Sequence, residues 1–283
     1  MKNILVPYDF SDVAHHALNF ATELARKGSD CKVTLINVIE QPTPDTIKTM
    51  GIVGHDPMES LYIKMLIDTV KGKMEAIMAD STYKDITLKY KIVLGQPFKE
   101  ISEEIKTSNI ELVVMGTSGS SGAEEFFVGS NAERMVRYSK CPVITIAKAT
   151  RADDIKDIVL ASNYHDVPVS FVDHVKKLQK VFGAKLRLVK INTPASFTST
   201  RHDRKQMEDF ISKFGIENYT HESYNYSNEE DGVIAFAEDI DADLIAIGTR
   251  QRRGVGHFLA GSIAEDVVNH SQVPVWTFGL DNA

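Results

Sequence analysis

The sequence predicts an α/β fold made of two tandem, doubly wound parallel five-stranded sheets. Three observations predict it. At roughly 100–200 residues per domain, a chain of 283 residues favours two domains. Short apolar segments alternate with amphipathic ones, and repeated β-α units imply a parallel sheet with helices on both faces. The chain also repeats itself: Leu112–Thr117 matches Leu244–Thr249, and Cys141–Val143 matches Val273–Val275.

The composition is that of an ordinary globular protein, with 43% hydrophobic and 25% charged residues and a net charge of −7. The acidic balance argues against a general nucleic-acid partner, which requires a basic face. No apolar run approaches the roughly 20 residues of a membrane helix, and no secretion signal is recognisable at the start. We therefore expect a cytoplasmic protein with no membrane partner, in which Cys31 and Cys141 are free buried thiols.

The strands of the first half follow from their apolar patterns. Asn3–Asp9 begins as a short apolar run and ends in a carboxylate, and Val33–Val38 is the next strand. Residues 86–92 alternate between apolar and polar, which predicts an edge strand. Leu112–Gly116 is wholly apolar, as a central parallel strand should be, and Val143–Ala147 closes the half.

The intervening helices show the helical period. Ser11 is expected to cap a helix with Val13, Ala17, Phe20, Ala21 and Leu24 on one face. Further helices are expected over Met58–Met78, after Pro97, and from a cap at Ser130. The first half carries an extra stretch, Gln41–Pro57, which reads as a long loop of the kind that forms a lid or a partner surface.

The second half repeats the pattern, with strands at Asp157–Asn163, Leu186–Ile191, Leu244–Thr249 and Val275–Phe278. Its first helix carries Val172, Val175, Leu178 and Phe182. The charged stretch Lys148–Lys156 reads as the link, so the predicted domains are residues 1–148 and 156–283.

The candidate site lies at the carboxyl ends of the strands, where ligands of open parallel sheets bind. Asp9 ends the first strand and Gly116 the fourth, and Gly119, Gly122 and Gly129 follow before Ser130 opens a helix. Glycines allow the backbone to approach an anion, and the amides of a helix N-terminus favour negative charge. Hydroxyls of Ser118 and Ser130 can donate to phosphate, while the Asp9 carboxylate can accept from ribose. A flexible surface loop is the competing interpretation of the glycine-serine run taken alone.

At this point the chain resembles the universal stress protein family. The nucleotide-binding members of that family carry Gly-x2-Gly-x9-Gly-Ser/Thr, and Gly116, Gly119, Gly129 and Ser130 have this spacing. The opening Ile4–Ser11 and the ending Cys141–Ile146 are also similar to the family pattern. The resemblance covers essentially the whole chain, twice over.

The resemblance implies a strand order of 3-2-1-4-5 in each half and an adenine nucleotide, ATP or else AMP or ADP, between strands 1 and 4. Asp9 and the backbone of Gly116 would hold ribose, and the backbone of Val38 would contact adenine. It also implies that the fifth strands pair the halves as a pseudo-dimer. Mg²⁺ bridging the phosphates is plausible, although no dedicated protein ligands are evident. The expected nucleotide-binding residues are Pro7, Asp9, Val38, Met115, Gly116, Ser118, Gly119, Gly129, Ser130 and Asn131.

The second half departs from the pattern. Asn163 replaces the carboxylate, and Gln251 stands where the first half has Gly119. Nucleotide binding there is therefore expected to be weak or absent. Arg250, Arg252 and Arg253 are solvated loop residues or, alternatively, compensating phosphate ligands.

Three functions remain open. The first is an ATP-binding regulatory protein of a stress response, which acts through an unidentified protein partner. A homodimer is common in such proteins. The second is a slow ATPase, although the chain has neither the Gly-x4-Gly-Lys-Ser/Thr phosphate loop nor an evident general base. The third is an interaction module that binds no nucleotide, or that binds another small apolar ligand.

Overall fold

The computed structural model describes residues 1–40, 57–117, 129–249 and 263–280. The first half contains strands β1 (Asn3–Pro7), β2 (Lys32–Ile39), β3 (Thr87–Leu94), β4 (Leu112–Gly116) and β5 (Val143–Ile146), and helices α1 (Asp12–Arg26), α3 (Pro57–Ala79), η1 (Ser81–Tyr83), α4 (Pro97–Thr107) and α5 (Ser130–Tyr138). The second half contains strands β6 (Asp157–Ala161), β7 (Lys185–Asn192), β8 (Tyr219–Asn225), β9 (Leu244–Thr249) and β10 (Val275–Gly279), and helices α6 (Val169–Phe182), α7 (Thr200–Phe214), α8 (Glu229–Asp239) and α9 (Ile263–His270).

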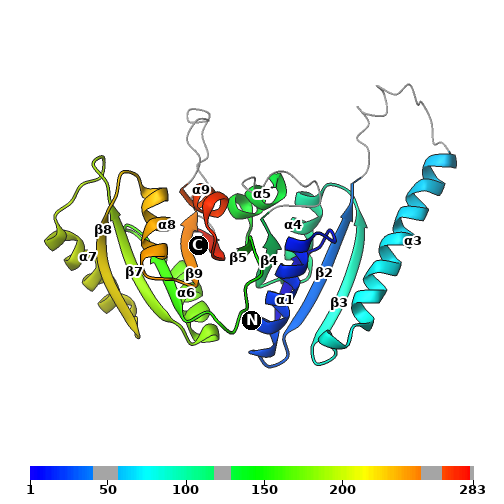
Figure 1. The fold of residues 1–283 in the computed structure, drawn as a ribbon, viewed down its shortest axis with the longest axis horizontal. Coiled ribbons are helices and arrows are strands. Elements are labelled where there is room, and N and C mark those ends of the chain that lie inside the picture. Colours follow the sequence, from blue (N-terminus) through cyan, green and yellow to red (C-terminus); the bar gives the residue numbers. More distant parts are fainter. Residues whose placement is uncertain (41–56, 118–128, 250–262, 281–283) are drawn as a thin grey trace, which may run out of the picture.

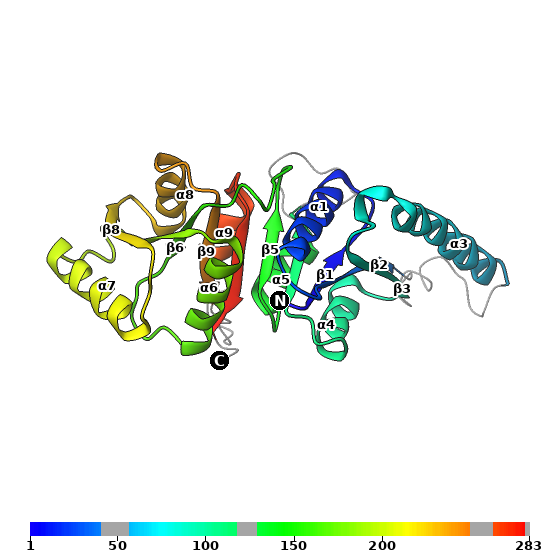
Figure 2. The ribbon, with the colours of Figure 1, turned by 90° about the horizontal axis from the view of Figure 1, so that it is seen from below.

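The ten strands of the described residues belong to one continuous sheet, in the order β3-β2-β1-β4-β5-β10-β9-β6-β7-β8. Each half has the order 3-2-1-4-5 with parallel neighbours, which confirms the predicted fold class. The halves join through the antiparallel pair β5–β10, in which Ile144 lies opposite Trp276. The predicted pairing of the fifth strands is therefore confirmed, and the two halves lie side by side across this seam (Figures 1 and 2).

The strand and helix ends follow from local sequence. The alternating strand β3 is at the edge of the sheet, as its pattern predicts. The Ser11 side chain accepts a hydrogen bond from the amide of Ala14 and caps α1, also as predicted. Helices α6 and α7 end at Gly183 and Gly215, whose φ angles of 65° and 58° suit glycine.

One prediction at a helix terminus is wrong. Ser130 was expected to cap α5, but Gly129 occupies the cap position and Ser130 is the first helical residue. The backbone amide of Gly129 donates to the carbonyl of Thr117, 2.7 Å away, and this bond fixes where the helix begins. A serine just inside the helix leaves its hydroxyl on the solvent side, and Ser130 is exposed.

The two faces of the sheet are packed differently. Helices α1, α3, α6 and α7 cover one face, and their buried side chains form a single core that runs through both halves. On the other face, α4 and α5 cover the first half and α8 and α9 cover the second, as two clusters, and Val136 of α5 packs into the cluster of the second half. The shared core makes the first face the more continuous connection between the halves.

The segment between the halves is packed rather than free in solvent. Ala152 and Ile155 are fully or almost fully buried in the shared core. The carboxylate of Glu23 on α1 accepts the backbone amide of Ala152 at 2.7 Å, and Lys27 pairs with Asp153 at 2.8 Å. The charges in this stretch predict a polar link, but its two buried apolar side chains anchor it beside α1.

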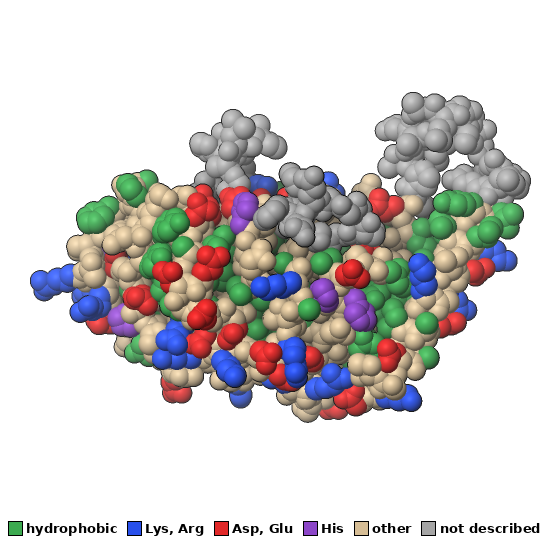
Figure 3. Space-filling model, in the orientation of Figure 1, with side chains coloured by type: hydrophobic (Ala, Val, Ile, Leu, Met, Phe, Trp, Pro, Cys, Tyr) green, Lys and Arg blue, Asp and Glu red, His purple; other side chains and the backbone are tan. Residues whose placement is uncertain are grey.

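The surface is mixed in charge. Acidic and basic side chains are interspersed over the face drawn in Figure 3. Cys31 and Cys141 are free and buried, as predicted. Among the described residues, none of the helices has the length and apolar character needed to cross a membrane.

Candidate functional site

The candidate site is at the point in the first half where the strand order reverses. β1 lies between β2 and β4, so the chain proceeds in one direction to β2 and β3 and in the other to β4 and β5. Open parallel sheets bind ligands at such a point, beyond the carboxyl ends of the strands. Pro7 ends β1 opposite Ile36 of β2, and Gly116 ends β4 opposite Ile146 of β5.

Asp9 stands in a tight turn between β1 and α1. Its Oδ1 accepts the backbone amide of Ser11 at 3.0 Å and the Ser11 hydroxyl at 2.5 Å. The intervening Phe10 has a φ of 68°, a left-handed conformation that is unusual for a bulky residue. The carboxylate is thus exposed at a defined place at the edge of the sheet, as hydrogen bonding to ligand hydroxyls requires.

The backbone beside Asp9 is held by a residue that the sequence analysis missed. The buried side chain of Asn37 donates to the carbonyl of Tyr8 at 2.7 Å, and the Tyr8 amide donates to the carbonyl of Ile36 at 2.9 Å. The Tyr8 hydroxyl lies 3.3 Å from Nδ1 of His15, and burial, with smaller effects from Tyr83 and Asp9, raises the pKa of Tyr8 to about 12. A polar residue within the apolar run of β2 was the available signal for Asn37.

Gly116 is required by the packing of α1. A Cβ at this position would lie 2.8 Å from Cγ2 of Val13, closer than real Cβ atoms approach their neighbours. The missing side chain therefore allows α1 to pack against the end of β4. Next to it, Met115 is 5% exposed and its side chain belongs to the core on the other face of the sheet.

The start of α5 lies next to the end of β4. The hydrogen bond from the Gly129 amide to the Thr117 carbonyl brings them together. Gly129 and Asn131 are half-buried and Ser130 is exposed, so the first turn of the helix is accessible. Unpaired amides at a helix N-terminus attract anions.

The structure thus brings most of the predicted residues to one edge of the sheet. Pro7, Asp9 and Gly116 come from adjacent strand ends, and Gly129 and Ser130 are tied to the end of β4. Val38 lies in β2, two residues after Ile36, which pairs with Pro7 at the end of β1, and it is half-buried. The predicted residues Ser118 and Gly119, and most of the expected loop over Gln41–Pro57, lie outside the described residues.

The corresponding edge of the second half is built differently. Oδ1 of Asn163 accepts the amide of His165 at 3.1 Å, which reproduces the turn at Asp9 without the charge. A Cβ on Gly248 would lie 2.7 Å from Leu280, a residue that follows β10, instead of meeting the first helix of its half. Gln251 and the three arginines near it lie outside the described residues. The Asn163 side chain and the Leu280 contact distinguish this edge from that of the first half.

A metal site is not part of the arrangement that the structure describes. In residues 1–40, 57–117, 129–249 and 263–280, no group of three or more His, Cys, Asp or Glu side chains is placed to hold a metal ion. The chemistry available at the described edge of the first half is therefore hydrogen bonding, one exposed carboxylate and a helix N-terminus.

Comparison with known proteins gives a consistent result. The sequence model described as the universal stress protein family matches residues 1–147 and again residues 155–278. A universal stress protein of Methanocaldococcus jannaschii is 29% identical over 151 residues, which are 52% of this chain and 82% of that protein. A putative universal stress protein of Staphylococcus haemolyticus is 28% identical over 165 residues, 58% of this chain and 94% of that one.

Solved structures share the whole architecture. The crystal structure of a universal stress protein from Archaeoglobus fulgidus superimposes with a TM-score of 0.75. The match covers 98% of this chain and 96% of that one at 20% sequence identity. At this identity the likeness establishes the fold.

Proposed function

Because the chain belongs to the universal stress protein family, whose sequence model matches it in both halves, we propose that its first half binds an adenine nucleotide, ATP in particular. The proposed ligand set is Pro7, Asp9, Val38, Met115, Gly116, Ser118, Gly119, Gly129, Ser130 and Asn131. Asp9 would accept hydrogen bonds from ribose, and the first turn of α5 would receive the phosphates.

One observation supports this proposal above the others. An exposed carboxylate and an accessible helix N-terminus occupy the ends of two adjacent strands, β1 and β4, at the reversal of strand order. A nucleotide has hydroxyl donors at one end and anionic oxygens at the other. Its two ends therefore match the two chemistries placed at this edge.

The proposed role is regulatory. Hydrogen bonds and a helix dipole that bind the ground state and the transition state of a phosphate equally produce no acceleration. We infer that nucleotide occupancy changes the chain's affinity for a protein partner in a stress response. Mg²⁺ would bind through the phosphates. A homodimer would form through surfaces other than β5 and β10, because these two strands pair with each other within the chain.

The division of roles is testable by calorimetric titration of the full-length chain with ATP, AMP and adenosine. Affinity should fall in that order, because each lost phosphate removes anionic contacts with α5. Ser130→Ala should weaken ATP by roughly two- to tenfold, the value of one hydroxyl hydrogen bond, and leave adenosine unchanged. Ser262→Ala, the matched change in the second half, is the control. Equal affinity for ATP and adenosine would refute the placement of the phosphates.

A further inference from the structure

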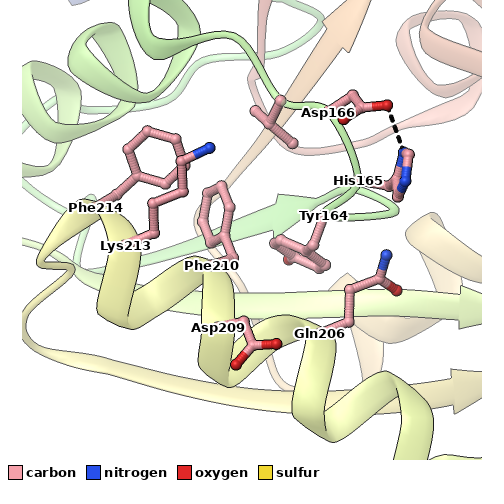
Figure 4. A pocket seen from close by; sticks show the side chains of 9 residues that line it. Tyr164, His165, Asp166, Gln206, Asp209, Phe210, Lys213 and Phe214 are labelled. Carbon is pink, nitrogen blue, oxygen red and sulfur yellow. Dashed lines mark ion pairs between the residues drawn. The ribbon is translucent and has the colours of Figure 1, made fainter.

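The second half contains a hollow that the nucleotide proposal does not use. It lies between α7 and the loop that joins β6 to α6, and has a volume of about 200 Å³ (Figure 4). The loop contributes Tyr164–Val167, and α7 contributes Gln206, Phe210, Lys213 and Phe214 among others. Since pockets for drug-sized ligands have volumes of about 300–1,000 Å³, a hollow of this size suits only a smaller molecule, with roughly one ring.

The loop wall of the hollow is held in an unfavourable backbone conformation. Tyr164 and Asp166 have φ angles of 57° and 48°, so two non-glycine residues within three are left-handed. The Tyr164 hydroxyl is shared between the carbonyls of Leu160 at 2.5 Å and Val189 at 3.2 Å, which fixes its ring beneath the loop. Strain of this kind persists where surrounding contacts impose it, and it is concentrated at functional sites.

The first half does not shape the corresponding loop in this way. Phe10 follows β1 as Tyr164 follows β6 and is also left-handed, but its ring contacts Tyr8 at a centroid distance of 5.3 Å. The ammonium of Lys73 from α3 lies 5.0 Å from the centroid of the same ring and covers it. Helix α1 begins two residues after Phe10, whereas α6 begins five residues after Tyr164. The additional loop residues of the second half form the wall of the hollow.

The floor of the hollow is aromatic. The rings of Tyr164 and Phe210 meet edge to face with centroids 5.1 Å apart, and the ring of Phe214 lies 5.0 Å from that of Phe210. Figure 4 shows these three side chains in a row from the loop to the helix. Tyr164 and Phe210 are 6% and 5% exposed and Phe214 is half-buried, so the floor presents a small apolar surface. It is suited to the ring or branched side chain of a small ligand.

The rim carries charges of both signs. Asp166, on the loop, pairs with Nδ1 of His165 at 2.8 Å, and the ammonium of Lys213, on α7, lies 4.9 Å from the centroid of Phe214. In Figure 4 the side chains of Asp166 and Lys213 lie on separate sides of the hollow, above the rings of Phe210 and Tyr164 in this view. Asp209, also on the helix side, pairs with Lys205 at 3.3 Å. The rim thus offers a carboxylate on the loop and an ammonium on the helix.

We propose that this hollow binds a small zwitterion with an apolar body, in the manner of a free amino acid. The ammonium of the ligand would face Asp166, its carboxylate would face Lys213, and its side chain would rest on the aromatic floor. The rim is solvent-exposed, with the Asp166 side chain 82% accessible, so each charge contributes modestly and binding is weak. The site is independent of the proposed nucleotide site in the other half.

The ligand class is tested with three probes on the full-length protein: L-phenylalanine, phenethylamine, which lacks the carboxylate, and 3-phenylpropionate, which lacks the ammonium. Amide chemical shifts in a ¹⁵N-labelled sample report binding. L-phenylalanine should shift the resonances of residues 164–167 and of α7 with a dissociation constant in the millimolar range or below. Each of the other probes should bind at least threefold more weakly. Equal binding of all three probes, or shifts confined to other residues, would overturn the proposal.

Two surface variants assign the charges, each with a matched control. Asp166→Asn keeps a side chain that tolerates the left-handed backbone, and Lys213→Met keeps the length of the chain. Each should weaken L-phenylalanine by about three- to tenfold, and Asp166→Asn should leave 3-phenylpropionate unchanged. Asp173→Asn and Lys177→Met, exposed on α6, should have no effect. L-phenylalanine affinity that is the same in the pocket variants as in the controls would contradict the proposed orientation.

Discussion

Replacing Gly116 by alanine should destabilise the protein through a collision with α1. The added Cβ would lie 2.8 Å from Cγ2, 3.0 Å from Cβ and 3.1 Å from the backbone carbon of Val13, whereas ordinary contacts begin at 3.4 Å. Rotation of the Val13 side chain can relieve the Cγ2 contact, but Cβ and the backbone carbon move only with the helix, which must therefore shift by about 0.3–0.4 Å. Overpacking of this kind costs about 1–3 kcal/mol, equivalent to about 2–5 °C in Tm for a chain of this size.

Gly248→Ala in the second half is the matched comparison. The three atoms nearest to its Cβ would all belong to the Leu280 side chain, the first at 2.7 Å, and a partly buried side chain near the end of the described chain can turn aside. The expected loss is therefore below about 1 kcal/mol. Thermal unfolding of both variants followed by circular dichroism measures the difference. If the two variants have the same Tm, or if Val13→Ala fails to recover any of the loss at Gly116, the proposed packing role of Gly116 is wrong.

Three further results are expected. Asp203→Ala should lower the free energy of unfolding in urea by about 3–5 kcal/mol, because it leaves the buried Lys190 without its carboxylate partner. Burial alone would raise the pKa of Asp203, but the hydrogen bonds from Lys190 and its neighbours hold this pKa below its ordinary 3.8, so the stabilisation is full above about pH 4 and declines as acid protonates the carboxylate. A variant as stable as wild type at pH 7 would contradict this. Trp276 is 1% exposed on β10 at the seam, and its fluorescence should change at the same urea concentration as the far-ultraviolet circular dichroism, because one sheet and one core span both halves. Two separated transitions would show that the halves unfold independently. Neither Cys31 nor Cys141 should react with a thiol reagent at pH 8 in the folded protein, because burial raises the pKa of Cys141 to about 11 and also raises that of Cys31; rapid reaction of either would contradict their burial.

The architecture was predictable because local patterns repeat. An apolar run such as Leu112–Gly116 can only be a buried strand in this context, and the alternation in residues 86–92 marks a strand with one exposed face. The same repetition located Asp9 and Gly116 at equivalent strand ends, and the structure places those ends side by side. These features depend on periods of two and 3.6 residues, which the sequence displays directly.

The remaining features depend on contacts between residues that are distant in the sequence. Asn37 holds the carbonyl of Tyr8 from the neighbouring strand, and Leu280 meets Gly248 only because β10 lies beside β9. Ala152 and Ile155 lie among charged residues in the sequence, and no local pattern shows that they pack into the hydrophobic core beside α1. Such contacts follow from strand register and helix position, which sequence periodicity does not specify.

The carboxylate of Asp9 is the central proposed ligand, for the sugar of ATP, and one calorimetric titration tests this role directly. Asp9→Asn preserves the turn, since Asn163 makes the same backbone hydrogen bond in the second half, while it removes the charge and replaces one acceptor oxygen with an amide donor. Wild type should bind one ATP per chain, Asp9→Asn should bind it roughly tenfold more weakly, the value of one charged hydrogen bond at an exposed site, and Asn163→Ala should match wild type. Undiminished binding in Asp9→Asn, or binding lost only in Asn163→Ala, would contradict the account.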